Sequence, residues 1–423
     1  MKSNIWATRC VLFCFVFWLF MGFVYHICLH SGTYFMYDYS EMMINYEGGF
    51  VRRGLAGQVL FGLCQAIPCS LFTLVKAFNV IVSISYLWLI LHIFRKEGWS
   101  PMVLCLGCGF LFIAFNTFSR KDFLLLLLAY YIYSSYKRFV LNKSWKALFL
   151  LEALSILQLL MHEAAFFFTY PILMVWHCLK LWQEGQRKTT CYIKALIPFL
   201  PILFVFFIVS LFKGDEQVAQ TIWQSWRGVM MAYPDGQNPE VVGLGVNALT
   251  WKALPTFLFH LRVTYLGMDP VSWRTPIHVI LQLANFGFVY YFATRINMAN
   301  PNLYPLTLRN DGTRISNFLI IQFVFMLPMF TILSCDSGRT FPYWVLSSLM
   351  ACHVFGHLQI PFVVNTSKKL QLLINKSWLN KSSCYLLLML LVPIPPYYAP
   401  GWMNSPIVMF VDKFKQMLEQ LFF

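Results

Sequence analysis

The amino-acid sequence alternates long apolar segments with short polar connections, and this alternation restricts the fold more than any other feature. The apolar segments lie at about 10–28, 70–94, 101–118, 123–136, 147–162, 164–182, 195–212, 276–294, 316–334, 341–360 and 384–398. A membrane-spanning helix needs about 20 mostly apolar residues, and a bilayer allows a single segment to satisfy its backbone only as a helix. The sequence therefore predicts an all-α polytopic membrane protein with about eleven transmembrane helices, forming a single integral membrane domain over residues 1–423.

The composition excludes several classes of protein. Hydrophobic residues make up 59% of the chain and charged residues 12%. Soluble domains contain about 45–50% apolar residues and about 25% charged residues. Soluble enzymes, disordered regulators and secreted disulfide scaffolds are thus excluded. The net charge of +15 does not indicate nucleic-acid binding, because the basic residues lie in short tracts between apolar segments. The CxxC pair Cys105/Cys108 has no second pair to complete a zinc site, so we expect neither a metal nor another cofactor.

Basic residues concentrate in alternate connections, which indicates the orientation of the chain. They are Lys2, Arg9, Arg95, Lys96, Lys137, Arg138, Lys143, Lys146, Lys180, Arg187, Lys188, Lys194, Arg295, Arg309, Arg314, Lys368, Lys369, Lys376 and Lys381. The positive-inside rule places this face and the N-terminus in the cytoplasm. The first apolar segment is followed by no small-residue cleavage site, so it is predicted to remain as an uncleaved span.

The opposite, extracytoplasmic face has two long connections, at 29–69 and 213–275. Within the first, Gly54–Cys69 is too short and too rich in glycine to span, and an interfacial or re-entrant helix is predicted. In the second, Trp223 and Trp226 beside Arg227 suit the stacking of sugar rings, although anchoring at the membrane interface is the preferred interpretation. The C-terminal tail, 399–423, is predicted to contain an amphipathic helix on the outer membrane surface.

A turn on this outer face carries two adjacent arginines, which the positive-inside rule does not explain. The segment 46–55 reads YEGGFVRRGL and includes Glu47, Arg52 and Arg53. Glycines allow a tight turn and a close approach to a ligand, and two guanidinium groups can hold phosphate oxygens. The alternative is a surface turn whose arginines reach lipid headgroups.

Three further polar groups interrupt apolar segments on the same face. His162-Glu163 divides two apolar runs, and partial burial there would raise the pKa of the glutamate while the imidazole relays a proton. Arg120, Lys121 and Asp122 form a connection too short to leave the membrane surface, where charges tend to mark sites. Asp336 and Arg339, at i and i+3, can pair or jointly hold a substrate. For each group the alternative is structural: a polar helix end, an anchoring cluster or a salt bridge.

Together these groups suit a lipid-anchored anionic substrate whose phosphate lies at headgroup level. Arginines would neutralise a pyrophosphate leaving group, and a carboxylate or histidine would deprotonate an incoming hydroxyl. The candidate catalytic residues are Glu47, Asp122, His162, Glu163 and Asp336, and the candidate substrate-binding residues are Arg52, Arg53, Arg120, Lys121, Arg227 and Arg339. The chemistry expected is glycosyl transfer without a metal, from a polyprenyl-linked donor.

Four motifs also carry a resemblance to a known family. The segments 47–55 (EGGFVRRGL), 119–122 (SRKD), 162–163 (HE) and 336–339 (DSGR) resemble motifs of Wzy-type O-antigen or capsular polysaccharide polymerases. The resemblance implies a GT-C-related fold in the bacterial inner membrane, with the active site facing the periplasm. It implies an undecaprenyl-pyrophosphate-linked repeat unit as donor, a second lipid-linked oligosaccharide as acceptor, and a chain-length regulator protein as a partner besides membrane lipids. It makes Arg52, Arg53, Arg120 and Arg339 pyrophosphate or glycan contacts and His162 or Glu163 the base.

Two alternative functions remain open. A GT-C transferase that adds one sugar from a polyprenyl-phosphate donor would use an acid of the first outer loop, where Asp38, Glu41 and Glu47 are available. A transporter or flippase of lipid-linked oligosaccharides would require paired charges inside spans and matching halves. The sequence has Lys76 and Glu152 within spans but no internal repeat, so transport is the third interpretation.

Overall fold

The fold is known from a computed structural model. It describes residues 37–100, 121–232, 241–266, 274–297, 311–334 and 337–392, with a few isolated positions in the two terminal segments. The predicted spans at 10–28 and 101–118 and the predicted amphipathic tail therefore lie largely outside the described residues.

The described part of the chain is all-helical and contains no strand. Among these residues, four helices are long and apolar enough to cross a membrane: Leu71–Glu97, Ala165–Gln183, Thr189–Leu211 and Gly312–Thr331. Helices also cover other predicted spans, namely α6 (Asp122–Asn142), α7 (Trp145–Met161), α15 (Arg274–Thr294), α17 (Ser337–Phe355) and α19 (Ser382–Leu391). The helical class is thus confirmed, whereas a total of eleven spans stays a prediction.

Large apolar side chains cover the outside of the membrane-length helices. Ile81, Ile84 and Trp88 on α4 (Leu71–Glu97) are more than half exposed, as are Phe204 and Phe207 on α10 (Leu200–Leu211). Soluble proteins rarely expose contiguous apolar patches of this kind. The hydrocarbon interior of a bilayer is the environment that suits such a surface.

The chain divides into two compact units. One comprises 1–28, 89–116 and 256–423, and the other comprises 29–88 and 117–255. We call them the C-terminal unit and the central unit. Each is described by itself below, and the integral membrane domain over 1–423 stays a prediction.

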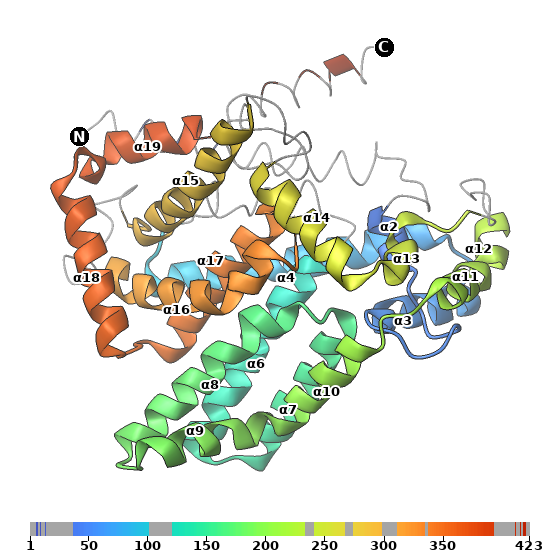
Figure 1. The fold of residues 1–423 in the computed structure, drawn as a ribbon, viewed down its shortest axis with the longest axis horizontal. Helices are drawn as coiled ribbons and strands as arrows, with labels where there is room; N and C mark the ends of the chain where they lie inside the picture. Colours follow the sequence, from blue (N-terminus) through green and yellow to red (C-terminus); the bar gives the residue numbers. More distant parts are fainter. Residues whose placement is uncertain are drawn as a thin grey trace. The chain divides into compact units, whose positions relative to one another are not determined.

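The central unit contains a helical bundle of α6, α7, α8 (Ala165–Gln183) and α10 (Figure 1). Buried polar side chains join these helices internally. The Gln158 amide donates to the Leu125 carbonyl at 2.8 Å and accepts from the Tyr170 hydroxyl at 2.8 Å. Because buried polar groups are costly unless paired, these bonds fix how the helices pack.

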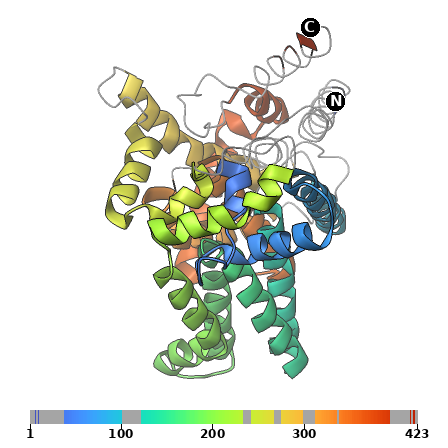
Figure 2. The same ribbon diagram turned by 90° about the vertical axis from the view of Figure 1, so that its right-hand side faces the viewer.

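A helical cap lies at the end of this bundle where α10 leads into α11, as Figure 2 also shows. We use the name cap for residues 37–66 and 214–250, which include α2 (Tyr37–Met42), α3 (Gly54–Ala66), α11 (Glu216–Ser225), α12 (Arg227–Ala232), α13 (Leu244–Asn247) and η4 (Ala248–Thr250). The two segments share one apolar core. The Trp226 indole donates to the Met43 carbonyl at 2.8 Å, and the Gly245 amide donates to the Ser40 hydroxyl at 2.7 Å.

The cap confirms one prediction for the long connections and corrects another. A helix is present at Gly54–Ala66, where a short helix was predicted, whereas the described parts of 213–275 form helices rather than a loop. Trp223 and Trp226 are completely buried in the shared core. They therefore contact neither a sugar nor the membrane interface, and both sequence-based interpretations of them are wrong.

Close packing of α3 on the preceding segment yields a stability prediction. A Cβ atom at Gly57 would overlap the backbone carbonyl of Ile44, whereas a Cβ atom at Gly62, on the same helix, would meet nothing within 4 Å. We expect Gly57→Ala to destabilise the protein by about 1–3 kcal/mol and Gly62→Ala to stabilise it by about 0.5–1 kcal/mol. Thermal unfolding of the purified variants measures both, and equal shifts would contradict this packing.

The C-terminal unit is built on an aromatic core. Its helices are α15, α16 (Asp311–Thr331), α17, α18 (Pro361–Lys376), η6 (Trp378–Asn380) and α19, with α14 (Ala253–Leu266) entering it from residue 256. The ring of Phe286 lies 4.8 Å from that of Phe341 and 5.3 Å from that of Phe323, and Trp344 packs 5.4 Å from Phe323. The sequence analysis did not predict α18, which occupies a connection between two predicted spans.

Candidate functional site

The turn that precedes α3 has an unusual backbone. Gly49 has φ +107°, a conformation that favours glycine. Arg53, the N-cap of α3, has φ +66° and lies in the left-handed region that costs a non-glycine residue about 1–2 kcal/mol. Two hydrogen bonds hold this turn: the Arg52 amide donates to the Phe212 carbonyl at 2.8 Å, and the Lys121 ammonium donates to the Arg53 carbonyl at 3.2 Å. Strained backbone of this kind clusters at functional sites.

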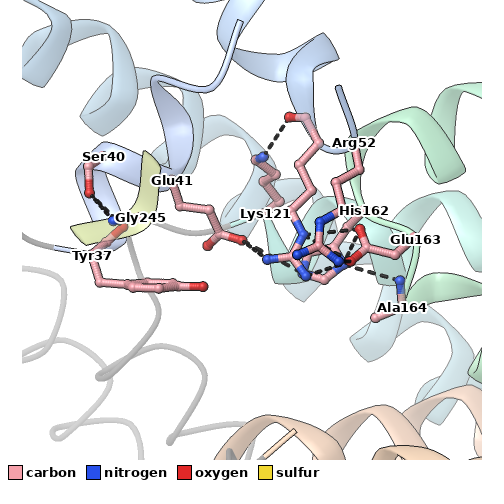
Figure 3. Close-up of polar contacts among 10 residues, drawn as sticks. Tyr37, Ser40, Glu41, Arg52, Lys121, His162, Glu163, Ala164 and Gly245 are labelled. Carbon is pink, nitrogen blue, oxygen red and sulfur yellow. Dashed lines mark hydrogen bonds and ion pairs between the residues drawn. The ribbon is translucent and has the colours of Figure 1, made fainter. Parts of the chain in front are cut away.

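Arg53 is the centre of a charged cluster, of which Figure 3 labels Glu41, Arg52, Lys121, His162 and Glu163. The Arg53 Nε donates to Glu163 Oε2 at 3.0 Å and its Nη2 to Glu163 Oε1 at 2.6 Å, which is a two-point contact. Its Nη1 donates to Glu41 Oε1 at 3.4 Å. One guanidinium therefore joins α2, the start of α3 and the connection between α7 and α8, and its hydrogen-bonding groups are largely used within the protein.

Arg52 is held much less firmly. Within the described part of the chain, its side chain donates from Nη1 to Glu163 Oε1 at 3.4 Å. Its Nε is buried and has no hydrogen-bond partner in this part of the chain. The side chain is 26% exposed, against 17% for Arg53. Arg52 thus retains more donors for a further anionic group than Arg53, which two carboxylates engage.

His162 and Glu41 form a second pair within the cluster. The Ala164 amide donates to His162 Nδ1 at 3.2 Å, so in the neutral imidazole the proton is assigned to Nε2. His162 Nε2 lies 3.7 Å from Glu41 Oε1, and both side chains are buried. A carboxylate in this position orients an imidazole and stabilises its protonated form. Figure 3 also shows the phenol of Tyr37 directed toward this pair.

The structure corrects the expected protonation of Glu163. Burial alone would raise its pKa, but the charge and hydrogen bonds of Arg53 outweigh burial and hold the pKa well below the usual range. Glu163 is therefore a charged partner of two arginines and a poor general base. The sequence could not indicate this, because Arg53 is 110 residues away along the chain.

The ion pair implies a pH dependence of stability. Because the pKa of Glu163 is lower in the folded than in the unfolded state, its stabilisation is complete above the unfolded value of about 4.3 and is lost as the pH falls through the folded value. We expect Glu163→Gln to lower the melting temperature at pH 7 and the difference from the wild type to shrink below about pH 4.3. The exposed Glu47 provides the control substitution Glu47→Gln, for which little change is expected. A Glu163→Gln variant as stable as the wild type at pH 7 would contradict the ion pair.

The predicted site residues meet only in part. Arg52, Arg53, Lys121, His162 and Glu163 lie together. Asp122 is buried at the start of α6 beside Lys121. Arg120 and Asp336 lie outside the described residues.

Two predicted residues are exposed outside this cluster, and a third belongs to the other unit. Glu47 is exposed, and its carboxylate accepts from the Gln58 amide at 3.3 Å. Arg227 is exposed at the start of α12. Arg339 belongs to α17 of the C-terminal unit. Glu41, by contrast, is a member of the cluster that the sequence suggested only for the single-sugar alternative.

The arginines give the cluster donors for an anion. Arg52, Arg53 and Lys121 lie against the carboxylates of Glu41 and Glu163, and the buried Asp122 follows Lys121 in the chain. The positive and negative formal charges are therefore balanced, and the unused donors of Arg52, rather than a net charge, would hold an anionic group. In the described part of the chain, no group of three His, Cys, Asp or Glu residues could hold a metal ion.

Comparison with known proteins identifies no relative: no family model, no curated protein and no solved structure matches the chain. The described residues give a coarser statement: a helical protein with four helices long and apolar enough to cross a membrane, and a largely buried cluster of arginine, glutamate and histidine.

Proposed function

We propose that this protein is a membrane glycosyltransferase of the Wzy type. It would transfer glycan from an undecaprenyl-pyrophosphate-linked donor to a lipid-linked acceptor on the extracytoplasmic face of the bacterial inner membrane. The observation that carries the proposal is the unequal use of two adjacent arginines. Arg53 is engaged by two carboxylates, and Arg52 beside it keeps buried and part-exposed donors unused.

Arg52 is suited to stabilise the pyrophosphate leaving group of the donor. A pyrophosphate gains negative charge as the glycosidic bond breaks, and donors already fixed in place stabilise that charge without reorganisation. The ion pairs of Arg53 and the ammonium of Lys121 fix the backbone that carries Arg52. In this proposal Arg53, Glu163 and Lys121 are positioning residues.

His162 is suited to act as the general base for the acceptor hydroxyl. The acceptor hydroxyl oxygen attacks the anomeric carbon and forms the new glycosidic bond. The bond from that carbon to the pyrophosphate oxygen breaks, and the lipid pyrophosphate leaves with the electron pair. His162 takes the hydroxyl proton at Nδ1, whose hydrogen bond from the Ala164 amide is broken in this step. The proton on Nε2 faces Glu41, 3.7 Å away, and this carboxylate stabilises the imidazolium.

One observation favours the second candidate, a transferase that adds a single sugar from a polyprenyl-phosphate donor. Glu41, an acid of the first outer connection, is buried in the cluster beside His162. It would then be the base itself.

Product mass distinguishes the two candidates. Purified protein is incubated either with a lipid-pyrophosphate oligosaccharide or with a lipid-monophosphate sugar, and products are weighed by mass spectrometry. We expect growth by whole repeat units from the first donor, unaffected by EDTA. Addition of one sugar from the second donor alone would replace the proposed function by the alternative, and a strict need for a divalent cation would contradict the mechanism.

A further inference from the structure

Helix α18 of the C-terminal unit is attached by one side only. Ser367 Oγ donates to the Thr313 carbonyl at 3.2 Å, and Gln371 Nε2 donates to the Tyr290 hydroxyl at 3.2 Å. With Val363 they form the buried side of the helix, at a spacing of four residues. Arg295 Nη2 adds a bond to Asn375 Oδ1 at 2.8 Å. The helix is thus fixed firmly along one edge.

The other side of α18 combines apolar and basic residues. Phe362 is 76% and Leu373 67% exposed, and Leu372 lies beside them, also exposed. The exposed lysines of this region are Lys368, Lys369, Lys376 and Lys381. Just beyond the helix, Trp378 is 65% exposed. No acidic residue occurs between Asp336 and Asp412, so the charged side chains that α18 itself carries are all basic.

The contacts of α18 also place it at the end of a helix that is able to cross a membrane. Thr313 lies at the start of Gly312–Thr331, a helix able to cross a membrane. Tyr290 lies near the C-terminal end of α15, the helix that precedes α16 in the chain. A helix fastened to the end of a membrane span lies where the hydrocarbon meets the headgroups. Figure 1 shows α18 lying across the end of α16, so its length, about 24 Å at 1.5 Å per residue, would run along this level.

We propose that α18 is a membrane-surface helix that binds anionic lipid headgroups. Its apolar side chains enter the boundary of the acyl chains, its lysines contact the phosphates above them, and Trp378 lies at the interface as tryptophans commonly do. A protein partner would require a complementary acidic surface, whereas the anionic leaflet supplies that charge at the depth where α18 lies. The inference does not depend on the proposed function.

The test uses the full-length protein in nanodiscs of phosphatidylcholine with one fifth phosphatidylglycerol. A photoreactive benzoylphenylalanine replaces Leu373, and the crosslinking yields to labelled phosphatidylglycerol and labelled phosphatidylcholine are compared. We expect crosslinks to lipid with a marked preference for phosphatidylglycerol over its share of the bilayer. The same amino acid in place of the exposed Glu47 is the positional control, for which no such preference is expected.

Charge is tested by Lys368→Gln, Lys369→Gln and Lys376→Gln together. Each lysine near an anionic surface strengthens binding to that surface by about fivefold. The preference for crosslinking to phosphatidylglycerol over phosphatidylcholine should therefore fall at least about tenfold in the triple variant. The control is Arg138→Gln, Lys143→Gln and Lys146→Gln, which removes three exposed charges from another connection. If the triple variant does not fold, raising the salt concentration on the wild type serves instead, since screening should remove the preference. A crosslink to a second copy or another protein, no lipid crosslink, or a preference insensitive to both lysines and salt would overturn the proposal.

Discussion

Arg52→Ala is expected to reduce glycan transfer by about 10²–10³-fold while the protein keeps its thermal stability. The loss follows from removing a donor aimed at the charge that develops on the leaving group. Stability should change little, because Arg52 makes one long contact with Glu163, at 3.4 Å. Arg53→Ala should behave differently. It leaves the carboxylates of Glu41 and Glu163 buried without their shared partner, which costs about 3–5 kcal/mol.

The variants Arg52→Ala and Arg53→Ala therefore serve as experimental controls for each other. Transfer rate and thermal unfolding are measured on both variants, with Arg227→Ala as an exposed arginine outside the cluster. Arg52→Lys keeps the charge but loses the planar fork, and an intermediate rate is expected. If Arg52→Ala unfolded the protein, or if Arg53→Ala reduced activity at full stability, the assigned roles would be reversed.

His162→Ala is expected to lower the turnover rate by about 10²–10⁴-fold. The reason is loss of the group that accepts the acceptor proton. Because the substitution leaves a space beside Glu41, added imidazole should restore part of the rate. Glu41→Gln should lower turnover as well, since a neutral amide stabilises the imidazolium less.

The kinetic parameters separate catalysis from binding in these variants. A base that acts only in the transition state affects kcat, with KM nearly unchanged. The exposed Glu47 is the matched carboxylate, and Glu47→Gln should retain full turnover. A His162→Ala variant with normal kcat would remove His162 from the mechanism.

Much of the cluster could be predicted from sequence because its members share one property. Arg52, Arg53, Lys121, His162 and Glu163 all interrupt apolar stretches in connections predicted for one face of the membrane. Connections on one face can meet in space, and these do. The helical class followed for a similar reason, since apolar segments near 20 residues have only one way to satisfy their backbone in lipid.

The features that sequence missed depend on tertiary contacts. Trp223 and Trp226 have the composition of interface anchors, but they form a core with residues 39–75 that no local pattern reveals. Glu41 gained its role only through Arg53 and His162. For Glu163, burial and ion pairing act on the pKa in opposite directions, and the outcome required the geometry of Arg53. Helix α18 was not predicted from the sequence, because the connection that contains it has no apolar segment long enough to suggest a membrane span.

The central claim is that Arg52 serves a polymerising transferase, and one reconstitution tests it most directly. Purified wild-type protein and the Arg52→Ala variant are each given a polyprenyl-pyrophosphate oligosaccharide, and the products are separated by gel. The account predicts a ladder with steps of one repeat unit for the wild type and almost none for the variant at equal stability. No ladder from folded wild-type protein, or equal ladders from both, would contradict it.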